Sequence, residues 1–257
     1  MFAAGGAPYA DDMADSRATS FGAQAKDYEA GRPEYPFDAV AWMLEILPAG
    51  AQRVADVGAG TGKLTRAIAH APGAQIVAID PDPAMLAALR ENVPGVPTFS
   101  GTAESLPLPD DSLDAVVLGQ AWHWVDPVRA SAEIGRVVRA DGALGLIWNI
   151  RDERVGWVRD LSRIMHRSAA EEALAAGDPE VGAPFGALES DSWEWSRSMT
   201  REQLHRMASS RSAVITATPE ERERIHREME VLFDSLDFAD GVIDLPYITK
   251  AFRARRG

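Results

Sequence analysis

The sequence of 257 residues contains no cysteine. This absence excludes disulfide bonds, cysteine nucleophiles and cysteine-ligated zinc sites, although it does not identify a compartment. Basic residues are also scarce, because 26 lysines and arginines stand against 39 aspartates and glutamates, a formal net charge of −13. Nucleic-acid binding depends on lysine and arginine neutralising phosphates, so this balance argues against a nucleic-acid substrate. It is typical of a soluble protein.

Long apolar runs and metal-binding spacings are missing too. No stretch approaches the roughly 20 apolar residues of a membrane-spanning helix. The N-terminus lacks the basic region and apolar core of a signal peptide. The five histidines show no His-Glu-x-x-His or related spacing. We therefore expect a cytoplasmic protein that binds neither a membrane nor a metal ion, and the sequence gives no indication of its oligomeric state.

The rest of the chain is organised around a glycine-rich stretch at 54–62. Residues 53–57 are typical of a short buried strand, and residues 63–70 carry apolar side chains at helical spacing. Between the two, glycine occupies every second position, at Gly58, Gly60 and Gly62. Glycine allows the backbone to approach a ligand closely and to adopt positive φ. The pattern therefore predicts a binding site formed mainly by backbone.

Two phosphate-binding patterns fit this stretch poorly. A P-loop requires G-x-x-x-x-G-K-[ST], but Val57 stands at its first glycine and Leu64 at its hydroxyl position. A dinucleotide site requires G-x-G-x-x-G, and Lys63 stands at its third glycine. Asp56, directly before the turn, is unfavourable beside a pyrophosphate and favourable beside a cation. The stretch therefore favours a ligand that carries positive charge.

The run Asp-Val-Gly-Ala-Gly-Thr-Gly at 56–62 resembles the first motif of class I S-adenosylmethionine-dependent methyltransferases. Their cofactor carries an ammonium and a sulfonium group and no phosphate. The resemblance implies that the glycines admit the methionine part of the cofactor and that Asp56 favours its ammonium group. Specific motifs of the family extend over residues 21–149.

Further positions complete the cofactor site that this resemblance implies. Residues 75–80 are typical of a second buried strand, and its last residue, Asp80, can accept hydrogen bonds from ribose hydroxyls. The stretch 102–108 resembles the loop that receives the adenine, although its spacing alone is equally that of a surface loop. The expected cofactor-binding residues are Tyr28, Arg32, Asp56, Gly58, Ala59, Gly60, Gly62, Asp80, Pro81, Met85, Ala103, Glu104 and Gln120.

The order of strands and helices indicates the fold class. Strands expected at 53–57, 75–80, 96–101 and 113–119 alternate with helices, which predicts a parallel, doubly wound sheet. Further strands are expected at 143–150, 193–197 and 243–252, and one helix at 155–176. We therefore predict an α/β protein with a Rossmann-like, seven-stranded sheet and, as the family fold implies, a reversed final pair of strands. Ligands of such sheets bind beyond the carboxyl ends of the strands.

The expected organisation is one methyltransferase domain at 21–257 behind a mobile arm at 1–20. Within the domain we expect a lid and first helix at 21–50, a cofactor-binding half at 51–150 and a C-terminal half at 151–257 that contributes to the acceptor pocket. The segment with Tyr28 and the Arg-Pro-Glu-Tyr-Pro run at 32–36 resembles the lid of small-molecule methyltransferases. A helix that covers one end of the core is the alternative.

The exit of the fourth strand, Gln-Ala-Trp-His-Trp at 120–124, is the most unusual stretch. Two tryptophans there are unfavourable unless something covers them. We expect Trp124 to pack beneath the following helix, and Trp122 and His123 to face the cofactor or acceptor. The pattern is similar to trans-aconitate methyltransferase-like proteins, which act on small carboxylic acids. The fifth strand continues the resemblance, so the expected substrate-binding residues are Trp122, Trp148 and Asn149.

These features predict methyl transfer from S-adenosylmethionine to a small molecule, with S-adenosylhomocysteine as the product. In-line displacement onto a carboxylate or hydroxyl oxygen is favoured. His123 is the expected catalytic residue, as a base for a hydroxyl acceptor or as a group that orients the acceptor. Two alternatives remain. One is an NAD-dependent oxidoreductase, and the other is a methyltransferase-like fold that acts as a binding protein or a non-methylating cyclase.

Overall fold

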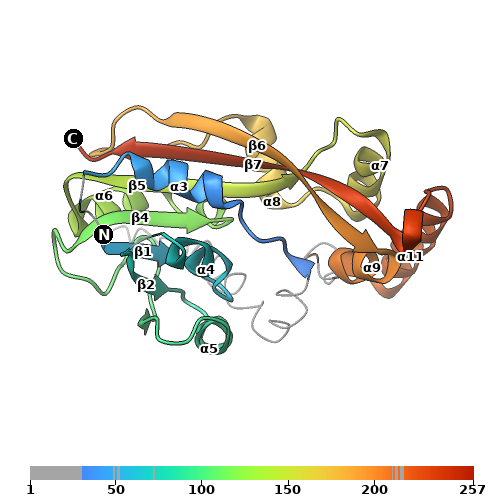
Figure 1. Cartoon of the computed structure of the whole chain (residues 1–257), viewed down its shortest axis with the longest axis horizontal. Coiled ribbons are helices and arrows are strands. Elements are labelled where there is room, and N and C mark those ends of the chain that lie inside the picture. The colour runs from blue at the N-terminus through green and yellow to red at the C-terminus, as the bar shows by residue number, and fades with distance from the viewer. Residues whose placement is uncertain are drawn as a thin grey trace, which may run out of the picture.

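A seven-stranded sheet runs through the protein in the order β3-β2-β1-β4-β5-β7-β6 (Figure 1). The structure is a computed structural model that describes residues 31–48, 50, 53–71, 73–209, 211, 214 and 217–257. The arm at 1–20, Tyr28 and most of the expected lid lie outside the described residues. The strands are β1 (Arg53–Val57), β2 (Gln75–Ile79), β3 (Thr98–Phe99), β4 (Leu113–Gly119), β5 (Val138–Arg151), β6 (Glu189–Thr200) and β7 (Val242–Arg255).

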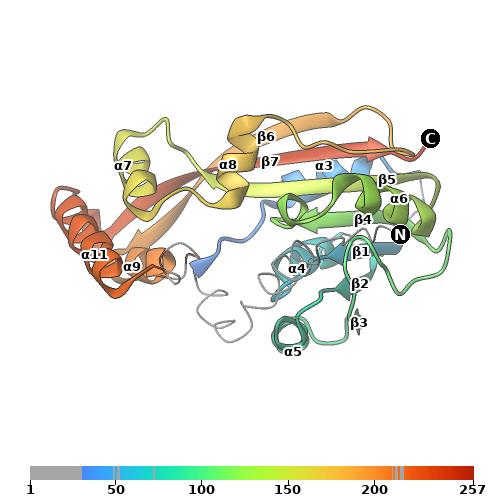
Figure 2. The same cartoon turned by 180° about the vertical axis from the view of Figure 1, so that it is seen from behind.

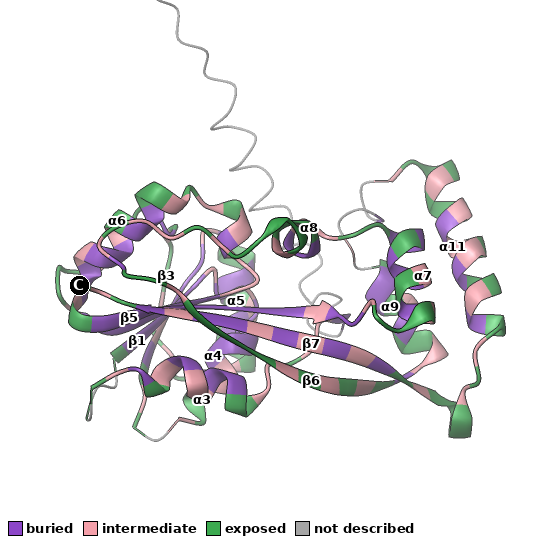
Figure 3. Ribbon diagram, turned by 90° about the horizontal axis from the view of Figure 1, so that it is seen from above, coloured by how far each residue is buried: buried purple, intermediate pink, exposed green. Residues whose placement is uncertain are grey.

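The strand pairing confirms the predicted fold class. The first five strands pair in parallel, whereas β7 lies between β5 and β6 and pairs antiparallel with both. The last two strands are thus reversed in spatial order, as expected. Strand β4 is buried over its first six residues, as is typical of a parallel strand that is covered on both faces. Figure 3 shows the contrast between the buried β5 and the more exposed edge strand β6.

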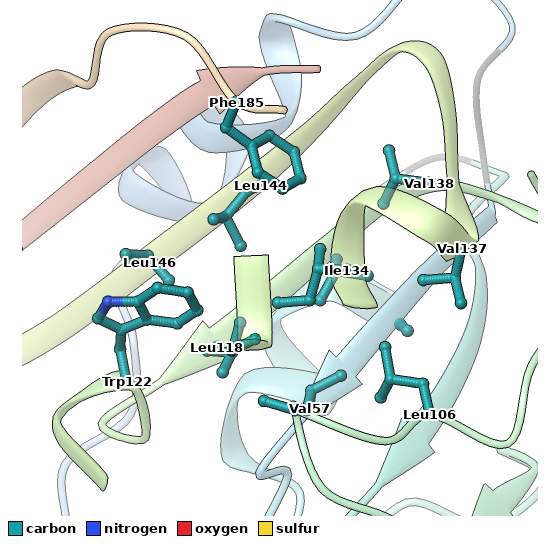
Figure 4. Close-up of a cluster of buried hydrophobic side chains, with 14 of the residues drawn as sticks. Val57, Leu106, Leu118, Trp122, Ile134, Val137, Val138, Leu144, Leu146 and Phe185 are labelled. Carbon is teal, nitrogen blue, oxygen red and sulfur yellow. The ribbon is translucent and has the colours of Figure 1, made fainter. Parts of the chain in front are cut away.

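Helices cover both faces of the sheet (Figures 1 and 2). On one face, α3 (Phe37–Glu45) and α4 (Lys63–Ala69) pack on β1, β4 and β5. On the other, α6 (Pro127–Val137) and α8 (Ala169–Ala176) cover the same strands. Figure 4 shows part of this second core, in which Ile134 of α6 lies against Leu118 and Leu144. The alternation of side chains along each strand supplies apolar residues to both layers.

Two aspartates fix the loops that leave the carboxyl ends of β2 and β4. Asp82 accepts a hydrogen bond from the Ala84 backbone N–H and caps α5 (Pro83–Asn92). Asp126 accepts from the backbone N–H groups of Val128 and Arg129 and caps α6. In both helices proline occupies the first turn, where its missing N–H has no helical partner to lose. These caps hold in place the loops at the ligand-binding edge of the sheet.

The C-terminal half has a second hydrophobic core of its own. The long strands β6 and β7 extend beyond the rest of the sheet, and α7 (Gly156–Met165), α9 (Arg201–Ser209) and α11 (Pro219–Asp234) pack at that end (Figure 1). The single helix expected at 155–176 is wrong, because α7 ends before His166, whose φ is 62°, and α8 starts at a separate cap on Ser168. No helix of the described residues is long and apolar enough to cross a membrane.

Candidate active site

A cleft opens where β1, β4 and β5 end. It brings together residues from four separate parts of the chain, namely the segment before α3, the glycine turn, the end of β4 and the end of β5. Among the expected site residues, those that line it are Arg32, Asp56, Gly58, Ala59, Gly60, Gln120 and Asn149. It is also lined by Pro33, Tyr35, Thr61, Lys63, Leu64 and Gly119, which the sequence analysis did not assign to the site.

The first two glycines of the turn are required for different reasons. Gly58 has a φ of +69°, and a Cβ atom there would lie 2.7 Å from Cβ of Ala121. Gly60 has a φ of +54°, but among the described residues, its two chain neighbours aside, no atom lies within 4 Å of where its Cβ would be. Gly58 therefore allows the turn to pack against the loop after β4, whereas Gly60 leaves a bare stretch of backbone facing the open cleft.

Asp56 is the buried acid at the base of this cleft. Its Oδ2 accepts a hydrogen bond from the Thr65 hydroxyl at 2.6 Å, whereas its Oδ1 is buried without a hydrogen-bond partner in the part of the chain that the structure describes. Burial raises the pKa of this carboxyl to about 7, and the Thr65 hydrogen bond opposes the shift. A buried oxygen without a partner is costly unless a ligand completes its hydrogen bonds. The position suits a cationic donor group.

Asp80 supports the glycine turn. Its Oδ2 accepts from the Gly60 backbone N–H at 2.8 Å, and its Oδ1 accepts from the Asp82 backbone N–H at 2.9 Å. Burial raises the pKa of Asp80, while these two backbone hydrogen bonds lower it. The acid at the end of β2 is thus joined directly to the cleft through Gly60.

Four of the expected cofactor-binding residues, Pro81, Met85, Ala103 and Glu104, are not among those that line this cleft. Met85 and Ala103 are buried, and Pro81 is partly buried. Glu104 accepts a hydrogen bond from the Asp126 backbone N–H at 2.9 Å, which ties the loop after β3 to the start of α6. Their role toward a cofactor stays a prediction.

The segment before α3 is anchored to the cleft by side chains that the sequence analysis missed. Glu34 accepts from Nζ of Lys63 at 2.9 Å and from Nη2 of Arg66 at 2.7 Å. Its backbone carbonyl accepts from Asn149 Nδ2 at 3.0 Å. A Cβ on Gly119 would lie 2.7 Å from the Tyr35 hydroxyl, so this glycine makes room for the tyrosine. The Arg-Pro-Glu-Tyr-Pro run marked the segment, but no local pattern pairs Glu34 with Lys63.

A second pocket lies at the exit of β4, between the short helix η2 (Trp122–Trp124) and α8. Trp122, His123 and Trp148 line it together with the chain that follows α8. Trp122 is only 5% exposed and donates its indole N–H to the Glu180 carbonyl at 3.0 Å. Figure 4 shows its ring beside Leu118 and Leu146.

The expectation that Trp124 packs beneath the next helix is wrong. Trp124 is 50% exposed, and Trp122 occupies the core instead. The reason is the η2 turn, since a 3₁₀-helix advances about a third of a turn per residue and therefore points alternate side chains in different directions. Once Trp122 faces the core, Trp124 is directed away from it.

His123 lies in the wall of the second pocket. Its Nδ1 accepts a hydrogen bond from the Trp148 indole N–H at 3.3 Å. Burial and, to a smaller extent, the positive charge of Arg32 together lower the pKa of His123 to about 4. The imidazole is therefore neutral at physiological pH. Arg32 lines the first cleft, so its charge acts from there on a side chain of the second pocket.

Arginines gather near these cavities although the chain is acidic overall. The Nη1 of Arg197 donates to the Gly31 carbonyl at 3.3 Å, directly beside Arg32. Burial raises the pKa of Tyr247, and the nearby charges of Arg151, Arg197 and Arg32 oppose that shift. Arg151 is paired with Glu171 at 2.9 Å, so Arg32 is the arginine of this group whose charge lies along the cleft. Among the described residues, no group of three or more His, Asp or Glu could hold a metal ion.

Known proteins resemble the chain over most of its length. A family model described as a methyltransferase domain matches residues 55–146. An uncharacterised methyltransferase of Mycobacterium tuberculosis is 44% identical, over 91% of this chain and 95% of the relative. An uncharacterised methyltransferase-like protein of Schizosaccharomyces pombe is 35% identical, over 92% and 95% respectively.

A solved structure agrees at the level of the fold. The putative type II methyltransferase from Anaeromyxobacter dehalogenans has a TM-score of 0.64 at 22% identity and covers 87% of this chain and 97% of its own. The relatives match nearly from end to end, and the sheet order and glycine turn are those that the first motif predicts. The protein therefore belongs to the class I S-adenosylmethionine-dependent methyltransferases.

Proposed function

We propose that this enzyme transfers the methyl group of S-adenosylmethionine to an oxygen atom, carboxylate or hydroxyl, of a small molecule. The observation that carries the proposal is the buried, unpartnered Oδ1 of Asp56 at the base of the cleft. A carboxylate in that position favours the ammonium of a methionine group and disfavours the pyrophosphate of NAD.

The residues of the cleft fit this cofactor. The bare backbone at Gly60 leaves space for the methionine part, which a side chain would fill. Asp56 would bind the ammonium, and Asp80 would bind the ribose from the adjacent strand end. Gln120 holds its place by donating from Nε2 to the Asn149 carbonyl at 2.6 Å, so it closes the cleft on the acceptor side. When bound, the cofactor supplies an electrophilic methyl group on a positively charged sulfur.

The chain's own contribution is mainly orientation. A sulfonium is a good leaving group, so alignment of the acceptor oxygen with the methyl group accounts for most of the catalytic effect, up to about 7–11 kcal/mol in favourable cases. Arg32 lines the cleft and would attract an anionic acceptor, and Trp122 and Trp148 give the second pocket an aromatic wall. The C-terminal half contributes the rest of the acceptor pocket through the chain at 173–180.

Equilibrium titration tests the cofactor. We expect the protein to bind S-adenosylmethionine and S-adenosylhomocysteine in isothermal calorimetry and not to bind NAD. Release of S-adenosylhomocysteine in the presence of small carboxylic acids and alcohols then tests the transfer. Binding of NAD in place of the methyl donor would favour the oxidoreductase alternative, and a bound donor without turnover would favour a binding protein or cyclase.

The affinity for S-adenosylmethionine should depend on pH through Asp56. Because the pKa of the free carboxyl is about 7 and the ammonium needs the ionised form, binding releases a proton below pH 7. We expect the association constant to rise up to about tenfold per pH unit towards pH 7 and then to level off. Above about pH 8 it should fall as the cofactor's amino group loses its proton.

Calorimetry at pH 5.5, 6.5 and 7.5, in buffers with different ionisation enthalpies, measures the proton released. The Asp56→Asn variant is the control, since it should bind the cofactor weakly and its association constant should not rise between pH 5.5 and 7. An association constant that is flat from pH 5.5 to 7.5 in the unaltered protein would contradict the assigned role of Asp56.

A further inference from the structure

One ring nitrogen of His123 accepts a hydrogen bond from a side chain that can only donate. Trp148 of β5, which is 2% exposed, donates its indole N–H to His123 Nδ1. An indole nitrogen is a donor and never an acceptor, so Nδ1 must present its lone pair. The proton of the neutral imidazole is then on Nε2. The contact with Trp148 therefore fixes the tautomer of His123.

The charges around His123 keep the ring neutral. Arg32 disfavours a second proton, and burial acts in the same direction, which lowers the pKa to about 4. Asp178 and Glu180 line the same pocket, but both are exposed to solvent. Among the described residues Nε2 has no hydrogen-bond partner. The Nε2–H group is thus the polar atom that His123 offers to a ligand.

We propose that His123 binds the acceptor oxygen as an Nε2–H hydrogen-bond donor and is not a general base, so that the acceptor is an oxygen anion before it binds, as a carboxylate is. The proposal rests on the proposed function and narrows its acceptor class. Nε2 already carries a proton and cannot remove another. A proton taken up at Nδ1 would place two N–H groups against each other at the Trp148 contact.

The chemistry of the two acceptor classes differs in this respect. A hydroxyl must lose a proton when it is methylated. A carboxylate loses none, because its oxygen forms the new bond to carbon, the sulfur–carbon bond breaks and the electron pair stays on sulfur. A donor at Nε2 and the positive charge of Arg32, which acts on His123, both favour an anionic oxygen. His123 therefore supplies the hydrogen bond that a carboxylate needs and not the base that a hydroxyl needs.

Nitrogen NMR tests the tautomer on the full chain without cofactor. Long-range ¹⁵N–¹H correlation spectra of the imidazoles distinguish Nε2–H from Nδ1–H, and His123→Gln assigns the signal by its absence. We expect a single Nε2–H tautomer that stays neutral from pH 5.5 to 8. In Trp148→Phe the tautomers should mix and the pKa should rise. The control is Trp122→Phe, which removes a neighbouring indole that donates to the Glu180 carbonyl and should leave the signal unchanged.

An Nδ1–H tautomer in the unaltered protein, or protonation of His123 near pH 6.5, would overturn the proposal whatever the variants do. Circular dichroism melting curves check that both phenylalanine variants are folded. If the protein binds no S-adenosylmethionine, the proposed function fails while the spectra still decide the tautomer. The two failures are therefore distinguishable.

Turnover tests the acceptor class. Carboxylic acids and their matched alcohols, such as benzoic acid and benzyl alcohol, would be incubated with the methyl donor from pH 6 to 9. We expect methyl esters from acids, with no ionisation of His123 in the rate profile. His123→Gln keeps an N–H donor and should retain more activity than His123→Ala, which should lose about 10- to 100-fold. If alcohols were methylated at a rate that rises with pH, and this rise disappeared in His123→Gln, His123 would be a base and the proposal would be overturned.

Discussion

Replacement of Asp56 by asparagine should weaken the binding of S-adenosylmethionine by about 100-fold or more while it stabilises the fold. The amide has the shape of the carboxylate and can keep the Thr65 hydrogen bond at Oδ2, but it removes the charge that the ammonium requires. Loss of one partner of a buried charge pair costs about 2–5 kcal/mol of binding free energy. Calorimetry at pH 7.5 measures the change in affinity.

The stability change follows from the sign of the pKa shift. Burial raises the pKa of Asp56 to about 7 in the folded protein, against an ordinary value of 3.8 for an aspartate. A raised pKa means that the folded state holds the proton more tightly. The contribution of this carboxyl to the free energy of unfolding is therefore fully present below pH 4 and is lost as the pH rises towards 7. At pH 8 the asparagine variant should therefore exceed the original protein by roughly 1–3 kcal/mol in free energy of unfolding. At pH 4 the two should be nearly equal.

Asp114 provides the matched control for this substitution. It is also a buried aspartate of the sheet, but it lies at the opposite end of β4 and accepts from the Arg53 backbone N–H at 2.7 Å. It also pairs with Arg139. Asp114→Asn should therefore lower the free energy of unfolding and leave the affinity for the cofactor unchanged. If Asp56→Asn lowered stability in the same way without affecting affinity, Asp56 would be a structural residue.

The sequence predicts the fold well because the fold depends on local patterns. The glycine turn, the buried strand before it and the acid at the end of β2 can each be recognised within a few residues, and they determine the edge of the sheet at which the cleft opens. The cap of α9 is equally local, since Thr200 and Gln203 hydrogen bond to each other across a single turn. Local chemistry was sufficient for these elements.

Features that depend on pairing across the sheet could not be predicted in this way. The contact between Glu34 and Lys63, and that between Trp148 and His123, join residues 29 and 25 positions apart through the tertiary fold. The exchange of Trp122 and Trp124 has a similar origin, because the direction of a short 3₁₀ turn decides which indole enters the core. The sequence therefore marked the exit of β4 as unusual but did not reveal the orientation of its residues.

Replacement of Gly60 by valine should abolish measurable binding of S-adenosylmethionine while the protein remains folded. The position has a φ of +54° and lines the cleft, and no atom of the described residues beyond its chain neighbours lies within 4 Å of an added Cβ, so a valine side chain would occupy the space assigned to the methionine part. Positive φ at a residue with a Cβ costs about 1–2 kcal/mol of stability. We expect at least about a 100-fold loss of affinity, which corresponds to about 3 kcal/mol.

Gly95 separates this steric effect from backbone strain. It has a φ of +91° and also no atom within 4 Å of a Cβ, but it lies between α5 and β3, at the edge of the sheet away from the cleft. Gly95→Val should therefore lower the melting temperature by a similar amount and leave the calorimetric affinity for S-adenosylmethionine intact. Equal affinities for the two valine variants would show that the open face at Gly60 is not part of the cofactor site. A loss confined to Gly60→Val would instead support the assignment of the bare backbone of the glycine turn to the methionine group.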